Sequence, residues 1–312
     1  MTEMPVAHIS WALADNRERP DCDAFFQDVF GAEAVYEMLI TPETEHMRFD
    51  REESLMMVGD TMIIPIAPAG GGEDALSPLG NMLRRSAQPM RWIGVALKVR
   101  DLAAADARLR AAGFELHYDP GMEQHYFLIA RHQALGMRIE VIRQDLPNDP
   151  RRDRHWRPTK ARDAHPLGIE GLQAIGLSAP SLEEARALFA DRFGWPELSV
   201  RALPEAECAA FAMGDTVLEA LAGVPGSDVA DHARDIKGIY SLVFKVKDAR
   251  AAADYLSGRG LDLIGDVSGR FAISPEQAHG RLIWLTEQTP ENYPPVGSRM
   301  QEFAPPEGVS AA

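Results

Sequence analysis

Hydrophobic and polar positions follow one plan four times along the chain. Each copy opens with a short apolar or alternating run, and these runs occupy residues 7–15, 93–101, 173–181 and 240–248. Runs of this length and pattern are typical of β-strands. A polar turn ending near Asp or Ser comes next, then an amphipathic stretch closed by Gly, then three more strand-like runs. The pattern therefore predicts four βαβββ modules.

The modules correspond in alternation, the first with the third and the second with the fourth. The matching helical segments are AFFQDVFG (24–31) with ALFADRFG (187–194), and LRAAGFEL (109–116) with LSGRGLDL (256–263). The matching strand segments are GDTMII (59–64) with GDTVLE (214–219), and the hairpin at 127–142 with the one at 271–285. Because the similarity recurs in the same order, we interpret the chain as a tandem repeat of a module pair.

This repeat predicts an α+β protein of two domains, each made from two modules set edge to edge. In each module we expect one helix to cover one face of a small antiparallel sheet, and each module pair to curve into a partly open cup. Domain one is expected at 1–146 and domain two at 169–290. The charged, Pro-rich stretch 147–168 reads as a linker, and 291–312 as an extended tail.

Composition and charge argue against some classes of partner for this chain. The formal net charge is -15 and the pI is near 5.0, which argues against a nucleic-acid or anionic-membrane partner. No uninterrupted apolar run is long enough to span a bilayer. The first residues lack the basic and apolar segments of a secretory signal, and Cys22 and Cys208 are the only cysteines. These features predict a reduced, cytoplasmic location.

The paired-module plan resembles the vicinal oxygen chelate superfamily over most of the chain. That superfamily includes glyoxalase I, methylmalonyl-CoA epimerase, extradiol ring-cleaving dioxygenases and metal-free antibiotic-binding proteins of the bleomycin-resistance type. The resemblance implies four inward positions in each cup, one in the first and one in the last strand of each module. Three or four of these positions are His, Glu or Gln in the family, and they hold a divalent metal.

The first-strand position lies seven residues before the turn Asp or Ser. The positions so assigned are His8, Ile64, Gly94 and Glu140 in domain one, and Ala174, Glu219, Ser241 and Trp284 in domain two. Domain two has one carboxylate and no His, so no metal site is expected there. A lone buried acid such as Glu219 would need a partner or would be protonated.

Domain one carries the candidate site. The resemblance implies that His8 and Glu140 are ligands of a divalent metal such as Fe, Mn, Zn or Ni, and an acid–base pair is the alternative. Gly94 stands where the family has a second His. Because side chains alternate along a strand, Arg138 shares the face of Glu140, and Ser10 shares that of His8. Arg138 and Ser10 are therefore expected to position the substrate.

A third candidate ligand comes from the hairpin at 127–142. Folding it about Gln133–Gly136 sets Ile129 opposite Glu140 and places His125 on the inward face. His125 would then serve as an auxiliary metal ligand or as a proton shuttle.

The leading hypothesis is an enzyme of small-molecule metabolism with its site in the cup of domain one. The resemblance implies either ring cleavage of a dihydroxylated aromatic or a glyoxalase- or epimerase-like proton transfer. Domain two would then complete the pocket or form the surface of a homodimer. Two alternatives stay open: a metal-free protein that binds a small ligand in one cup, and a purely structural domain one.

Overall fold

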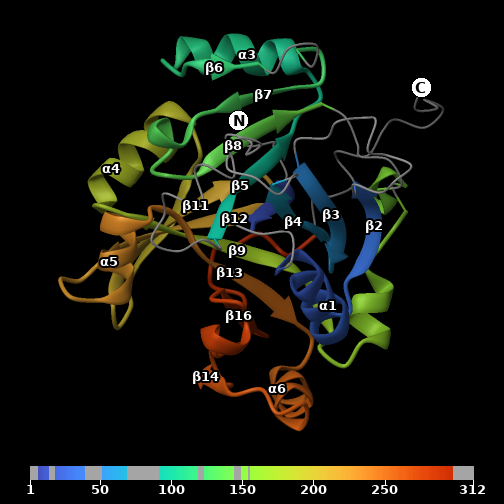
Figure 1. Cartoon of the computed structure of the whole chain (residues 1–312). Helices are drawn as coiled ribbons and strands as arrows, with labels where there is room; N and C mark the ends of the chain where they lie inside the picture. The colour runs from blue at the N-terminus through green and yellow to red at the C-terminus, as the bar shows by residue number, and fades with distance from the viewer. Residues whose placement is uncertain are drawn as a thin grey trace.

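The computed structural model describes residues 6–13, 18–38, 51–68, 91–118, 123–143, 149–153 and 155–297. These residues form two eight-stranded sheets with helices packed around them (Figure 1). The two sheets have equivalent strand orders, so the four βαβββ modules in two tandem pairs are confirmed.

The first sheet has the order β2-β3-β4-β1-β5-β8-β7-β6. Its strands are β1 (Val6–Ala12), β2 (Glu33–Met38), β3 (Arg51–Val58), β4 (Thr61–Pro68), β5 (Arg91–Lys98), β6 (Leu116–His117), β7 (Tyr126–Ile129) and β8 (Arg138–Ile142). Its module helices are α1 (Glu18–Phe30) and α3 (Leu102–Ala111).

The second sheet has the order β10-β11-β12-β9-β13-β16-β15-β14. Its strands are β9 (Ile169–Ala179), β10 (Glu197–Ala202), β11 (Ala206–Met213), β12 (Thr216–Gly223), β13 (Gly238–Val246), β14 (Leu263–Gly265), β15 (Phe271–Ile273) and β16 (Leu282–Thr286). Its helices are α4 (Leu182–Arg186), continued by a π-helical segment (Ala187–Arg192), α5 (Asp228–Asp235) and α6 (Ala249–Gly258).

Modules pair in chain order, because β1 runs antiparallel to β5 and β9 runs antiparallel to β13. The expectation of antiparallel sheets was wrong in one respect. The last strand of each module lies parallel to its first strand, as in β1 with β4 and β5 with β8. After the helix, the chain makes a three-strand meander whose last member lies beside the first strand, and this route gives a mixed sheet.

Polar turns and glycines bound the helices as the repeat predicts. The carboxylates of Asp101 and Asp248 accept backbone hydrogen bonds at the first turns of α3 and α6, each at 2.9 Å. Such side-chain caps satisfy N–H groups that have no partner within the helix. Gly113 and Gly260 follow these helices with φ of +81° and +78°, a conformation that favours Gly.

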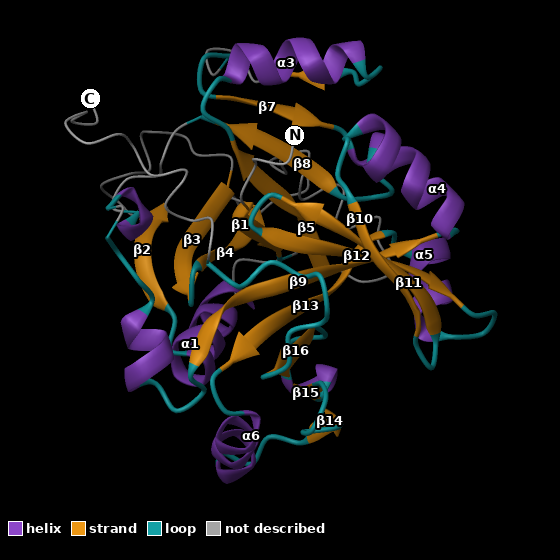
Figure 2. Cartoon of the chain, turned by 180° about the vertical axis from the view of Figure 1, so that it is seen from behind, coloured by secondary structure: helices purple, strands orange, loops and turns teal. Residues whose placement is uncertain are grey.

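The two domains share one hydrophobic core. The ring centroids of Phe30 and Phe244 are 6.5 Å apart, and those of Phe114 and Phe193 are 4.6 Å apart, so each domain contributes aromatic rings to the other. Asp60, in the turn before β4, accepts a hydrogen bond of 2.8 Å from the backbone N–H of Leu172 in β9. Figure 2 shows β9 and β13, the central strands of the second sheet, lying beside β5 of the first sheet.

Short helical turns lie between β8 and β9, a 3-10 helix (Pro150–Arg152) and a π-helical turn (Lys160–Ala164). Beyond β16, Tyr293 is buried against domain two, and residues 298–312 of the predicted tail lie outside the described residues. No helix in the described parts of the chain is long and apolar enough to cross a membrane.

Candidate active site

The last strand of the first cup carries two charged residues on one face. In β8, Ile139 and Val141 are fully buried in the shared core, whereas Arg138 and Glu140 are half-buried. Because side chains alternate along a strand, Arg138 and Glu140 both face away from the helices, into the cup. The burial pattern of β8 therefore agrees with the prediction that Arg138 and Glu140 share one face of the strand.

Strand register places the candidate positions in two neighbouring rows across the sheet. His8 is opposite Ala96, and Ala96 is opposite Glu140. Two strand spacings separate the backbones of His8 and Glu140, about 10 Å. The next row joins Ser10 to Gly94, and Gly94 to Arg138.

The structure explains why no His stands at position 94. A Cβ atom on Gly94 would lie 2.7 Å from the carbonyl carbon of Arg138 and closer still to its oxygen. Real Cβ contacts are never this short, so any side chain here would force β5 and β8 apart. A side chain at position 94 would therefore need β5 and β8 to separate.

His125 does not lie where the hairpin prediction put it. The observed register pairs Leu128 with Glu140 and Phe127 with Val141, one residue away from the predicted pairing. A slip of one residue moves every side chain to the opposite face. The observed register puts Phe127 on the helix side of the sheet, and His125 lies half-buried in the turn before β7 with its Nδ1 buried. The cause is the turn, in which a 3-10 helix (Arg131–Gln133) precedes Leu135 and Gly136 in the left-handed region.

The same register brings a residue into the cup that the sequence did not single out. Tyr126 pairs with Ile142 and packs against Ala96 and Ile142, on the face of Glu140. An apolar cluster lines the β3–β4 side of the cup and is formed by Leu55, Met57, Met62, Ile64 and Ile66. Further along the same face of β3, Glu53 lies opposite Ile66 and pairs with Arg51 at 3.0 Å. Trp156, from the segment between the domains, packs on that cluster.

The described side chains provide no site for a metal held by three protein ligands. The described residues contain no group of three His, Cys, Asp or Glu side chains close enough to hold an ion. In the cup of domain one, a side chain at Gly94 would collide with the backbone of Arg138, and His125 lies in the turn before β7. Among the described side chains on this face, the carboxylates of Glu140 and Glu53 are the candidate donors.

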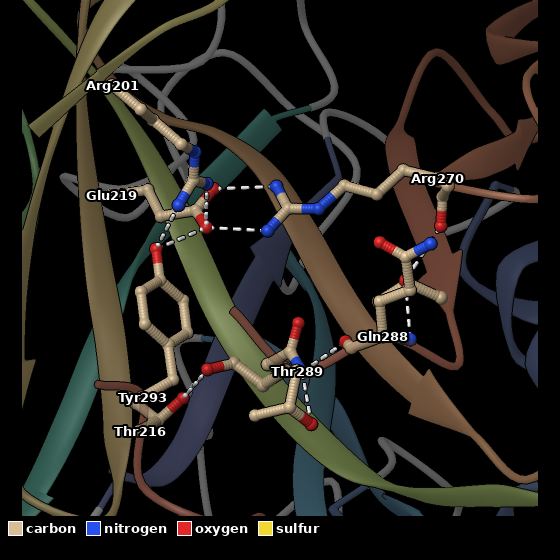
Figure 3. A network of polar contacts seen from close by, with 10 residues as sticks. Arg201, Thr216, Glu219, Arg270, Gln288, Thr289 and Tyr293 are labelled. Carbon is tan, nitrogen blue, oxygen red and sulfur yellow. Dashed lines mark hydrogen bonds and ion pairs between the residues drawn. The ribbon is translucent and has the colours of Figure 1, made fainter. Parts of the chain in front are cut away.

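The cup of domain two contains a network of charged side chains around Glu219 (Figure 3). Arg270 donates two hydrogen bonds to the Glu219 carboxylate, at 2.8 and 2.7 Å, and Arg201 donates one at 2.6 Å. The Tyr293 hydroxyl donates to Glu219 at 2.8 Å and accepts from Arg201 at 2.8 Å. Glu219 is thus the partnered acid that was one of the two expected outcomes.

The network keeps Glu219 ionised. Burial opposes ionisation, but the hydrogen bonds and positive charge of Arg270 and Arg201 outweigh it and lower the pKa of Glu219 to about 2. Burial also raises the pKa of the nearby Cys208 thiol to about 12, so the thiol is neutral at pH 7.

Sequence reasoning missed these partners because they come from distant segments. Arg201 lies in β10, Arg270 lies in the turn before β15, and Tyr293 follows the last strand. One of the partners could have been suspected from the sequence. The strand pattern ELSVRA (197–202) contains a single Arg and belongs to the same module as Glu219.

Three solved structures share the architecture of the chain. A variant of 4-hydroxymandelate synthase from Streptomyces coelicolor has a TM-score of 0.62 at 17% identity, covering 85% of this chain and 78% of its own. A 2,2',3-trihydroxybiphenyl 1,2-dioxygenase from Sphingomonas wittichii has a TM-score of 0.56 at 14% identity, covering 91% and 90%. A 2,3-dioxygenase from Pseudomonas has a TM-score of 0.56 at 12% identity, covering 95% and 98%.

No protein-family model matches the sequence, and no curated protein sequence matches it. The similarity is therefore one of structure, and it extends over both domains. Together with the repeated strand order of the two sheets, it shows that the chain has the two-domain fold of the vicinal oxygen chelate superfamily.

Proposed function

We propose that the chain is an enzyme of small-molecule metabolism whose active site is the inner face of the domain-one cup. The supporting observation is the strand register that places Glu140 in line with His8 across Ala96, on the sheet face that also carries the apolar cluster. An acid and an imidazole across a small residue can together remove and return a proton.

The proposed reaction is proton transfer next to a carbonyl group, as in an epimerase or a glyoxalase-like isomerase. Glu140 takes the substrate proton, and His8, as an imidazolium, gives its own proton to the opposite side of the bound substrate. Solvent then removes the proton from Glu140 and protonates His8 again. Arg138, in the row next to Glu140, places positive charge where the substrate oxygen becomes negative. Ser10, in the row of Arg138, orients the substrate through its hydroxyl.

We propose an oxygenated aromatic or carbonyl compound as the substrate class. Two of the structurally similar proteins are named for 4-hydroxymandelate and for 2,2',3-trihydroxybiphenyl, which are both hydroxylated aromatic compounds. The apolar cluster around Met57 and Met62 suits such a body, since Met adapts to flat and irregular ligands.

Solvent-proton exchange tests the proposal. The full chain is incubated in deuterated water with a panel of aromatic and aliphatic 2-oxo acids and 2-hydroxy acids, and loss of the α-proton signal is followed by NMR. We expect exchange with at least one compound, slowed about 100-fold or more in Glu140→Gln. Glu115→Gln, on an exposed carboxylate, is the matched control and should exchange at the wild-type rate.

A metal-free binding protein is the second candidate, and the apolar cluster of this cup favours it. That reading predicts tight binding of a panel compound without proton exchange, and unchanged binding by Glu140→Gln. Exchange at the wild-type rate in Glu140→Gln would contradict the enzyme proposed here.

A further inference from the structure

The charges in the cup of domain two do not balance. Arg201 and Arg270 are both cationic, and Glu219 is the only carboxylate among the described residues that pairs with either of them. Burial raises the pKa of the Tyr293 hydroxyl and of the Cys208 thiol, so both are neutral. The network therefore carries one net positive charge.

The positive groups form the solvent side of the network. The Glu219 side chain is 2% exposed, whereas those of Arg201 and Arg270 are each 26% exposed. The bidentate bonds from Arg270 would by themselves neutralise and orient the buried carboxylate. Arg201 adds a second cation, which costs desolvation energy without a second anion to offset it.

A buried apolar cluster with a half-buried edge lies next to these guanidinium groups. Tyr293 packs with Ala174, Val217 and Val243, and Trp284 lies half-buried against the same cluster. Two guanidinium groups can bind the carboxylate of a ligand, and the neighbouring aromatic and aliphatic side chains can contact a compact apolar group on the same ligand.

We infer that the cup of domain two is a binding site for a small monocarboxylate, held by Arg201 and Arg270 against the wall that includes Trp284. Glu219 acts as a positioning residue that fixes the planes of both guanidiniums. The ligand carboxylate supplies the missing negative charge. This site is separate from the one proposed in domain one and uses none of its residues.

Titration of the full wild-type chain with benzoate, followed by calorimetry, tests the inference. Benzamide is the neutral probe of the same shape. We expect one benzoate bound per chain, and binding at least about tenfold weaker for benzamide, because only the anion balances the charge. Equal affinities, or no benzoate binding by the folded protein, would overturn the inference without any variant being needed.

Two variants locate the site. Arg270→Gln makes the network neutral and should weaken benzoate binding about tenfold or more. Arg250→Gln removes the same charge from an exposed position on α6 and should change the affinity less than twofold. Benzoate affinity that survives Arg270→Gln in a folded protein would contradict the inference. These titrations leave Glu140 untouched, so they fail or succeed independently of the proposed enzyme.

Discussion

At the scale of single residues, Gly94 decides what the first cup can hold. It lies between Ser10 and Arg138 in its row, and the carbonyl of Arg138 occupies the space that a side chain would need. Gly94 is thus the residue type that the close approach of β5 and β8 accommodates, and residue types alone do not reveal that approach. The sequence showed the departure, and the structure supplies the cause.

We expect Gly94→Ala to lower the free energy of unfolding by about 2 kcal/mol or more, because the new methyl group collides with backbone atoms. Gly258→Ala is the matched control, since a Cβ there meets nothing within 4 Å and the residue ends α6. It should be neutral or stabilising by up to about 1 kcal/mol. Urea denaturation measures both, and equal effects would contradict the close approach.

Glu219 is the residue on which the second cup depends for its structure. Glu219→Gln leaves the Arg201 and Arg270 guanidiniums facing a neutral amide, which should cost about 3–5 kcal/mol at pH 7. The folded pKa of about 2 lies below the ordinary value of 4.5, so this stability is present above pH 4.5 and is lost as pH falls toward 2.

The difference between wild type and Glu219→Gln should therefore shrink between pH 4.5 and pH 2, as measured by urea denaturation at each pH. Glu205→Gln, on an exposed carboxylate, should stay within about 0.5 kcal/mol of wild type at neutral pH. A cost for Glu219→Gln that does not change with pH would show that the carboxylate is not ionised in the folded protein.

At the scale of elements, periodicity and spacing predicted most of the fold. The repeated turn Asp is the N-cap residue at which α3 and α6 begin. The Gly twelve residues later adopts the left-handed conformation just after each helix ends. These features are local, so one sequence contains them. The hairpin register around His125 was wrong because it depends on turn geometry at Leu135, where a non-Gly residue adopts φ of 49°.

Asp248→Ala tests the element boundaries. The Asp248 carboxylate accepts the N–H of Ala251 at 2.9 Å, so its removal should destabilise the chain by about 1 kcal/mol. Hydrogen exchange should speed up in the first turn of α6. Asp254→Ala removes an exposed carboxylate from the middle of the same helix and should leave that turn protected. Equal exchange in the two variants would argue against the cap.

At the scale of the whole molecule, the two domains are joined by a shared core and by buried polar contacts. Asp60 is the clearest of these contacts, because it lies in domain one and accepts the N–H of Leu172 in domain two. Burial raises its pKa to about 6, against the hydrogen bonds from Leu172 and Thr61. This contact joins residues far apart in the chain, which explains why sequence patterns could not specify it.

Asp60→Asn should change stability in a pH-dependent way. The folded pKa of about 6 exceeds the ordinary value of 3.8, so the wild type loses stability as pH rises from about 4 to above 6. Asn keeps an acceptor for Leu172 without the charge. The variant should therefore exceed the wild type by up to about 3 kcal/mol at pH 8 and match it near pH 4. Urea denaturation at both pH values checks this, and a constant difference would contradict it.

The central proposal is that the domain-one cup works through proton transfer by Glu140 and His8, without a metal held by three protein ligands. The most direct measurement is the metal-to-protein ratio of the purified full chain, of His8→Ala and of Glu140→Ala, combined with proton exchange after chelation. We expect no stoichiometric metal that depends on either residue, and wild-type exchange that survives the chelator. One Fe, Mn, Zn or Ni per chain, lost with activity in both variants, would contradict the account and favour metal-dependent dioxygenase or glyoxalase-like chemistry.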